Sequence, residues 1–182
     1  MARITLPEHP TPEQAEVIAE VVSGKRGRVP GPMVGWLPHP ELARRAQRLG
    51  ELLRYDTSLE PVLSELAILI CGRHWSSHYE WTAHKTIALE AGLDQRTVDD
   101  IAARKAAPFL RGEREAALYA VASTLLAQTK IDDALYTRGV AALGTRGMVD
   151  LVGILGYYSM VALTLNAFEL GLPEGHAPEL DS

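Results

Sequence analysis

The chain has 182 residues and a mass of 19.8 kDa, which is enough for one domain with a full hydrophobic core. Its 18 basic and 23 acidic residues give a formal charge of −5, which argues against a nucleic-acid binder, and a hydrophobic content of 47% excludes large-scale disorder. The single cysteine, Cys71, cannot close an intrachain disulfide or supply a thiolate zinc cluster, so a cytoplasmic location is expected.

The N-terminal region, 1–39, is expected to hold one helix and a connector. Thr11 precedes a proline, and Gln14 occupies the capping-box position, so a helix is predicted over 11–23. Four prolines and four glycines surround Trp36 in 24–40, which predicts an irregular segment laid over the surface. The main domain is expected at 40–173, followed by a tail at 174–182.

Seven further helices are predicted from the apolar period and from their capping residues, and they cover 40–55, 60–73, 77–92, 94–108, 112–128, 132–143 and 145–170. The 60–73 helix is apolar all round, which indicates burial on every side or a subunit contact. Gly92, Pro108 and Gly144 are the expected stops. No segment alternates apolar and polar residues, so the predicted fold class is an all-α bundle of about eight helices.

The apolar stretch 148–168 is long enough to resemble a membrane span. Asp150, Thr164 and Asn166 dilute it, so a buried helix is expected instead, and no membrane association. Residues 1–12 hold three prolines and no apolar core, so no secretory leader is expected.

Three ionisable residues fall on apolar helices, where a charged group needs a partner or a function. Glu65 lies at the start of the apolar run in 60–73, whereas Glu80 and His84 lie four residues apart on one face of the next helix. Ser77 lies on the same stripe. Because the link between these helices is short, Glu65 is expected to approach Glu80 and His84, with Arg73, His74 or His78 at the rim. A carboxylate beside an imidazole is a natural acid–base pair.

The same residues also have alternative interpretations in which their role is purely structural. Ser77 and Glu80 fit a capping box, and Glu65 could complement the helix dipole. His84 could be an interior histidine with no function. Zinc binding by His74, His78 and His84 is disfavoured because six residues turn the helix by about 240° between the last two.

Several stretches resemble the carboxymuconolactone decarboxylase and alkylhydroperoxidase D (AhpD)-like superfamily over roughly 40–173. They are ELAILI from Glu65, WSSHYEWTAH from Trp75 and GILGYY from Gly153. In the peroxidase branch of that superfamily, a glutamate is followed by a C-x-x-C pair and a histidine. This chain keeps the same four positions, at intervals of 12, 3 and 4 residues, with Glu65, Ser77, Glu80 and His84. Ser77 and Glu80 therefore stand in place of the two cysteines.

The absence of both cysteines from these positions favours the decarboxylase branch, because peroxide reduction in this superfamily needs two thiols. The resemblance implies a homotrimer or a dimer of trimers that acts on a small carboxylated lactone without metal or organic cofactor. His84, tuned by Glu80 or Glu65, would protonate the intermediate; Arg73 would hold a substrate carboxylate, Ser77 would contact the substrate, and Tyr157 or Tyr158 would donate to the lactone oxygen. The alternatives are a thiol peroxidase that uses Cys71 and a non-catalytic oligomeric binding protein.

Overall fold

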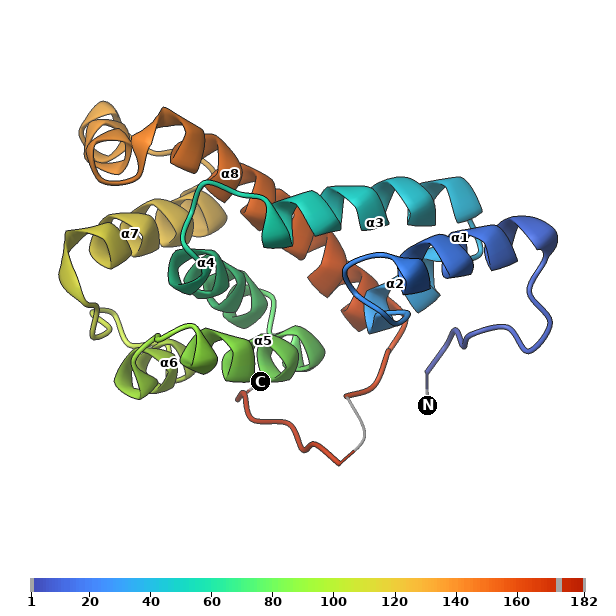
Figure 1. The fold of residues 1–182 in the computed structure, drawn as a ribbon. Helices are drawn as coiled ribbons and strands as arrows, with labels where there is room; N and C mark the ends of the chain where they lie inside the picture. Colours follow the sequence, from blue (N-terminus) through green and yellow to red (C-terminus); the bar gives the residue numbers. More distant parts are fainter. Residues whose placement is uncertain (1, 173–174, 182) are drawn as a thin grey trace.

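A computed structural model describes residues 2–172 and 175–181 (Figure 1). These residues form no strand, and their helices are α1 Pro12–Ser23, α2 Gly31–Trp36, α3 Pro40–Tyr55, α4 Pro61–His74, α5 His78–Glu90, α6 Gln95–Ala102, α7 Gly112–Gln128 and α8 Asp133–Ala167. The prediction of an all-α bundle is confirmed. The predicted boundary between domain and tail, at 173–174, lies outside the described residues.

Helix α4 is the central helix of the bundle. It contacts α5, α7 and α8, and every residue from Leu63 to Arg73 is buried. A helix that is apolar all round can satisfy the hydrophobic effect only where neighbours cover all of its faces. The sequence pattern therefore predicted this position correctly, and it fixes where Glu65 lies.

Helix α8 combines the last two predicted helices. Gly144, with φ 74° and ψ 164°, interrupts the helical geometry, so the predicted stop is a kink inside one long element. By length and composition α8 is the one described helix that could cross a membrane, with a mean hydropathy of 1.6 in its most apolar window. More than half of that window is buried within the protein, as in a core helix.

The prediction for 24–40 was wrong in part. Residues Gly31–Trp36 form α2, and Met33, Trp36 and Leu37 are buried against the bundle rather than laid over its surface. Trp36 donates a hydrogen bond of 2.8 Å from Nε1 to Thr164 Oγ1 on α8. Burial of these large apolar side chains outweighs the irregular backbone preference of the surrounding prolines and glycines.

Helix α6 is shorter than predicted, because it ends at Ala102 and not at Pro108. Asp100 accepts hydrogen bonds from the backbone N–H of Phe109, at 2.9 Å, and from Lys105 Nζ, at 2.5 Å. These bonds stabilise a turn after the helix, and Arg104 there adopts a positive φ of 51°. The turn that Asp100 stabilises therefore ends α6 before the proline is reached.

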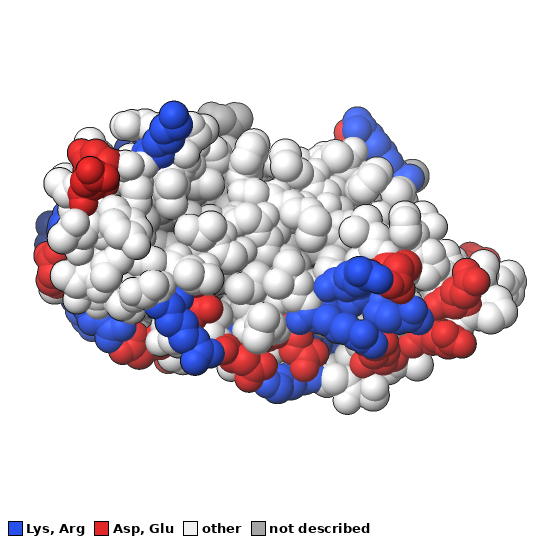
Figure 2. All heavy atoms as spheres, turned by 90° about the horizontal axis from the view of Figure 1, so that it is seen from above, with Lys and Arg blue, Asp and Glu red and all other residues white. Residues whose placement is uncertain are grey.

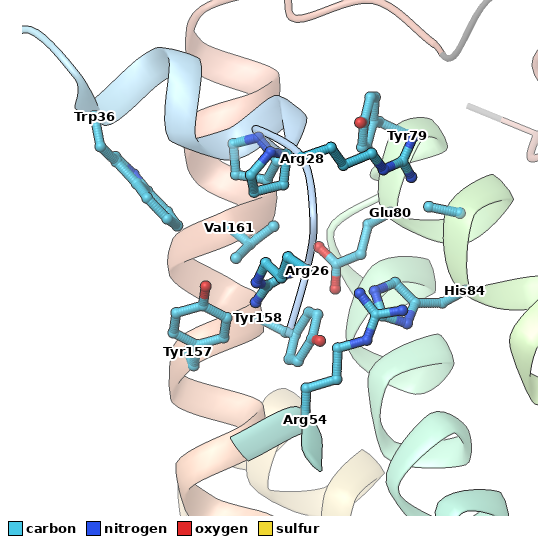
Figure 3. A pocket seen from close by; sticks show the side chains of 13 residues that line it. Arg26, Arg28, Trp36, Arg54, Tyr79, Glu80, His84, Tyr157, Tyr158 and Val161 are labelled. Atoms are coloured by element: carbon cyan, nitrogen blue, oxygen red, sulfur yellow. The ribbon is translucent and has the colours of Figure 1, made fainter. Parts of the chain in front are cut away.

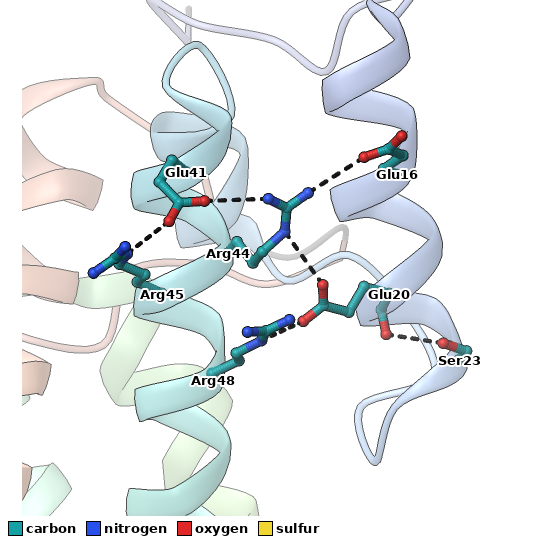
Figure 4. A network of polar contacts seen from close by, with 7 residues as sticks. All are labelled: Glu16, Glu20, Ser23, Glu41, Arg44, Arg45 and Arg48. Atoms are coloured by element: carbon teal, nitrogen blue, oxygen red, sulfur yellow. Dashed lines mark hydrogen bonds and ion pairs between the residues drawn. The ribbon is translucent and has the colours of Figure 1, made fainter.

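Charged side chains are unevenly distributed over the surface. Figure 2 shows acidic and basic side chains interspersed along the edges of one face, with a broad uncharged centre. One such cluster joins α1 to α3, where Arg44 contacts Glu16, Glu20 and Glu41, and Arg48 Nε lies 2.6 Å from Glu20 Oε1 (Figure 4). Each exposed pair contributes only about 0–1 kcal/mol, so these contacts orient α1 more than they stabilise it.

Candidate active site

A cavity of about 70 Å³ opens between α5, α8, the end of α3 and the segment that joins α1 to α2 (Figure 3). Its wall is formed by Arg26, Arg28, Pro30, Pro32, Trp36, Arg54, Tyr79, Glu80, Ala83, His84, Tyr157, Tyr158 and Val161. A cavity of this volume can hold several water molecules or a small ligand of similar size. Titratable side chains from three helices and the α1–α2 segment meet in this cavity, which makes it the candidate active site.

His84 and Glu65 form a buried pair at this site. His84 Nδ1 lies 2.7 Å from Glu65 Oε2, and both side chains are more than nine-tenths buried. Glu65 lies beyond the first turn of α4, so its role is contact with His84 rather than with the helix dipole. The other ring nitrogen, Nε2, has no hydrogen-bond partner among the described residues, and the ring lines the cavity. The pair therefore orients an imidazole toward the space that a ligand would occupy.

Glu80 lies beside His84 with its carboxyl group almost completely buried. Neither Oε1 nor Oε2 has a hydrogen-bond partner among the residues that the structure describes. Burial raises the pKa of Glu80 well above its usual range, because removal from water disfavours the ionised form. A carboxyl group held in its neutral form can donate a proton or a hydrogen bond at neutral pH.

The capping-box reading of Ser77 and Glu80 was wrong. Ser77 is the N-cap residue of α5, but its side chain makes no cap hydrogen bond and its Oγ is buried without a partner. The Glu80 side chain does not return to the helix start, since its carboxyl group lines the cavity. Ser77 lies outside that cavity and lines a separate hollow with His78 and Leu172, so it is not positioned to contact the same ligand as His84.

Aromatic side chains form the wall opposite Glu80. The Tyr158 ring meets the His84 ring edge-on, with centroids 5.1 Å apart, and Tyr157 packs against Tyr158 at 5.2 Å. Burial raises the pKa of both phenols, so they remain protonated donors. The Trp36 ring extends this wall, and its centroid lies 6.2 Å from the centroid of the Tyr157 ring. The packing fixes the rotation of the imidazole and leaves both hydroxyl groups neutral.

A glycine on α3 makes room for this wall. A β-carbon at Gly50 would overlap the Tyr157 hydroxyl and lie 2.9 Å from Nη2 of Arg26. We expect Gly50→Ala to displace both side chains and to destabilise the protein by about 1–3 kcal/mol, despite the higher helix propensity of alanine. Thermal unfolding would measure the loss. Gly72→Ala on α4, where a β-carbon would come no closer than 3.6 Å to any neighbouring atom, is the matched control and should not destabilise.

The expected position of Arg73 was wrong. Its guanidinium group donates to the carbonyl oxygens of Ala102 and Asp181 and to Ser76 Oγ, and it lines a different cavity with Arg104. Arg73 is near the C-terminal end of α4, more than two helical turns from Glu65. His74 also faces that second cavity, and His78 lines the hollow beside Ser77, so none of the three rim candidates reaches His84.

The cations of the site come from segments that the sequence analysis did not assign to it. Arg26 and Arg28 belong to the segment between α1 and α2, and Arg54 lies near the end of α3. Tyr79 holds the segment in place, since its Oη accepts a hydrogen bond of 3.2 Å from the backbone N–H of Gly31. No motif marks these arginines, because they are brought to His84 only by the packing of distant helices.

Cys71 lies away from the cavity wall in the buried face of α4. Its Sγ is 3.7 Å from the carbonyl oxygen of Leu155 and 3.5 Å from Ser159 Oγ. Burial raises the pKa of the thiol to about 12. Such a thiol carries almost no thiolate at neutral pH. In the described part of the chain, no three His, Cys, Asp or Glu side chains are grouped to hold a metal ion.

No protein-family model and no curated protein matches this sequence. Solved structures do match it. An uncharacterized peroxidase-related protein from Ralstonia eutropha JMP134, described as an alkylhydroperoxidase AhpD core, superposes with a TM-score of 0.78 at 17% identity, over 95% of this chain and 93% of that one. An uncharacterized peroxidase-related protein from Silicibacter sp. TM1040 superposes with a TM-score of 0.77 at 16% identity, over 95% of this chain and 92% of that one.

A third similar structure is a cysteine-to-alanine variant of the debrominase Bmp8 in complex with 2,3,4-tribromopyrrole, with a TM-score of 0.74 at 14% identity, over 96% of this chain and 92% of that one. At such low identities, the agreement concerns the fold. The chain therefore has the AhpD-like fold, which is the fold that the sequence resemblance implied.

Proposed function

We propose that the protein is a cofactor-independent carboxy-lyase of the carboxymuconolactone decarboxylase type, acting on a small carboxylated lactone. The observation that supports this most is the buried His84–Glu65 pair, whose imidazole lines one cavity with the buried Glu80 carboxyl group, a group whose pKa is raised by burial. This set provides proton donors without a thiol, a metal or an organic cofactor.

The reaction needs one electron sink and one proton. When the bond between the ring and the carboxylate breaks, CO2 leaves and the electron pair is delocalised into the conjugated lactone carbonyl. Glu80, and Tyr158 on the opposite wall, donate hydrogen bonds to the oxygen on which negative charge develops. His84, oriented by Glu65, then delivers a proton from Nε2 to the ring carbon, and solvent restores it.

The proposal is tested by mixing the purified protein with γ-carboxymuconolactone and following CO2 release, with His84→Ala as the inactive control. Cys71→Ser is the second control and should retain full activity, because the thiol is outside the cavity. Absence of release, or equal release by His84→Ala, would reject the proposal.

The two alternatives differ in what they require of the chain. A thiol peroxidase needs a reactive thiolate and a resolving thiol, whereas the sequence has one cysteine and its pKa is raised. A non-catalytic binding protein would keep the cavity but show no turnover. Loss of peroxide consumption in Cys71→Ser would favour the first, and ligand binding with no turnover would favour the second.

We also propose that the protein works as a homo-oligomer, a trimer or a dimer of trimers. The support is a row of exposed apolar residues on α8, namely Val149, Val152 and Leu163, with exposed fractions of 66%, 55% and 49%. Such a row is unfavourable in water unless another surface covers it. Light scattering should give three or six times the chain mass of 19.8 kDa, and Val152→Asp should shift the mass toward the monomer. A wild-type monomer would contradict this proposal.

A further inference from the structure

A second cavity, of about 230 Å³, lies between α4, α6 and α7 and takes no part in the proposed reaction. It shares no lining residue with the cavity beside His84. The end of α4 and the turn after α6 contribute Arg73, Arg104 and Lys105, and α7 contributes Tyr119 to the wall. The larger volume leaves room for an organic ligand.

Arg73 is a buried cation without an anionic partner at hydrogen-bond distance. Only 5% of its surface is exposed. Its Nε donates to the carbonyl oxygen of Ala102 at 2.8 Å, and its Nη1 donates to the carbonyl oxygen of Asp181 and to Ser76 Oγ. All three acceptors are uncharged, and Nη2 has no acceptor among the described residues. A guanidinium group removed from water is stabilised fully only by an opposite charge.

Arg104 brings a second positive charge to the same place. Its Nη2 donates to Ser76 Oγ at 3.1 Å, and Nη1 of Arg73 donates to that same oxygen at 3.3 Å. Neither arginine forms an ion pair within the described part of the chain, whereas Lys105 is paired with Asp100. Burial, and then the charge of Arg104, lower the pKa of Arg73, and Asp181 acts in the opposite direction. An anion in the cavity would relieve the repulsion between the two guanidinium groups.

The remaining wall of this cavity is mostly apolar. Ile70, Ile101 and Leu126 line it, together with two hydroxyl-bearing residues of α7. Burial raises the pKa of the Tyr119 phenol, so it stays neutral, and Ser123 Oγ donates to the Tyr119 carbonyl oxygen at 2.6 Å. A bare inorganic anion would leave this wall in contact with water, whereas a ligand with an apolar body would cover it.

We propose that the second cavity binds a small organic anion with an apolar body, of which aromatic carboxylates are the simplest class. Arg73 and Arg104 hold the carboxylate, and the body packs against Ile70, Ile101 and Leu126. The site is separate from the proposed active site, so this inference does not depend on the lyase reaction.

The test is a titration of the full chain with benzoate, followed by the methyl NMR signals of Ile70 and Ile101. Benzamide has the same ring without the charge, and acetate has the same charge without the ring. We expect benzoate to shift both methyl signals to saturation and to bind about 10-fold or more tightly than either probe, and added salt to weaken it. The Val161 methyl signals report separately on the cavity beside His84.

Three results of that titration would contradict the proposal. They are no saturable shift at Ile70 and Ile101, a shift confined to Val161, and equal binding of benzoate and benzamide. Acetate that binds as tightly as benzoate would contradict the apolar part of the assignment.

Variants assign the two parts of the site. Arg104 is exposed, so Arg104→Gln should fold, and it should weaken benzoate binding by about 10-fold, with part of the loss restored in Arg104→Lys. Ser123→Leu narrows the cavity without removing a charge and should also weaken benzoate. Arg45→Gln on α3 makes the same change in net charge outside the cavity and should bind like the wild type. An Arg104→Gln protein that melts normally and binds benzoate with unchanged affinity would overturn the assignment.

Discussion

Glu80→Gln is expected to change how the stability of the protein depends on pH. In the unfolded chain, Glu80 ionises near its ordinary pKa of 4.5, whereas burial raises its pKa in the folded protein. The folded state then retains the proton over a range in which the unfolded state loses it. Stability is therefore fully present below about pH 4.5 and is lost as the pH rises toward the folded pKa, by at most about 1.4 kcal/mol per pH unit.

Glutamine has a similar shape and does not titrate, so Glu80→Gln should gain stability relative to the wild type as the pH rises above about 4.5. Each 1 kcal/mol corresponds to about 2–4 °C in Tm for a chain of this size. Melting curves followed by circular dichroism would show the two Tm profiles diverging. Glu90→Gln, at the exposed end of the same helix, should instead run parallel to the wild type. Parallel curves for Glu80→Gln would mean that the carboxyl group is not held neutral.

His84→Ala is expected to lower kcat for lactone decarboxylation by about 10²–10⁴-fold, because the proton donor is lost. Glu65→Gln should also lower kcat but leave KM unchanged, since Glu65 contacts His84 and does not line the cavity. Glu65 is thus a positioning residue. The double variant should be no slower than His84→Ala alone, because a residue that acts through His84 has no effect once His84 is absent.

The folding of these variants needs its own control. Removal of one member of a buried ionic pair can cost about 3–5 kcal/mol, since the other charge is left without a partner. His84→Gln keeps a donor for Glu65 but cannot transfer a proton, so it should fold better than His84→Ala and be equally inactive. Additive rate losses in the double variant, or a change in KM for Glu65→Gln, would contradict the assigned roles.

The position of Glu80 separates this site from that of a thiol enzyme with the same frame. In the peroxidase branch that the sequence resembles, the two thiols stand where this chain has Ser77 and Glu80. Here Glu80 lines the cavity beside His84, whereas Ser77 faces a different hollow. One of the two positions therefore remains in the site, and it carries a proton donor in place of a nucleophile.

The sequence by itself determined the helical class and the central part of the site. The apolar run of α4 required burial on all sides, and the i, i+4 spacing of Glu80 and His84 placed both on one face of α5. The short link after α4 brought Glu65 alongside, and the 2.7 Å contact with His84 confirms that expectation. These features are local, because helix period and loop length fix which side chains meet.

Only the tertiary structure decided which cationic side chains line the cavity beside His84. Arg73 was the expected partner of an anionic substrate, but the turn after α4 directs it to backbone carbonyls. Arg26, Arg28 and Arg54 line the cavity instead, from segments 30 to 58 positions away from His84 along the chain, and the missing β-carbon at Gly50 allows the close approach of Arg26. Such contacts depend on how the helices pack against one another, and no periodicity within a single segment encodes that.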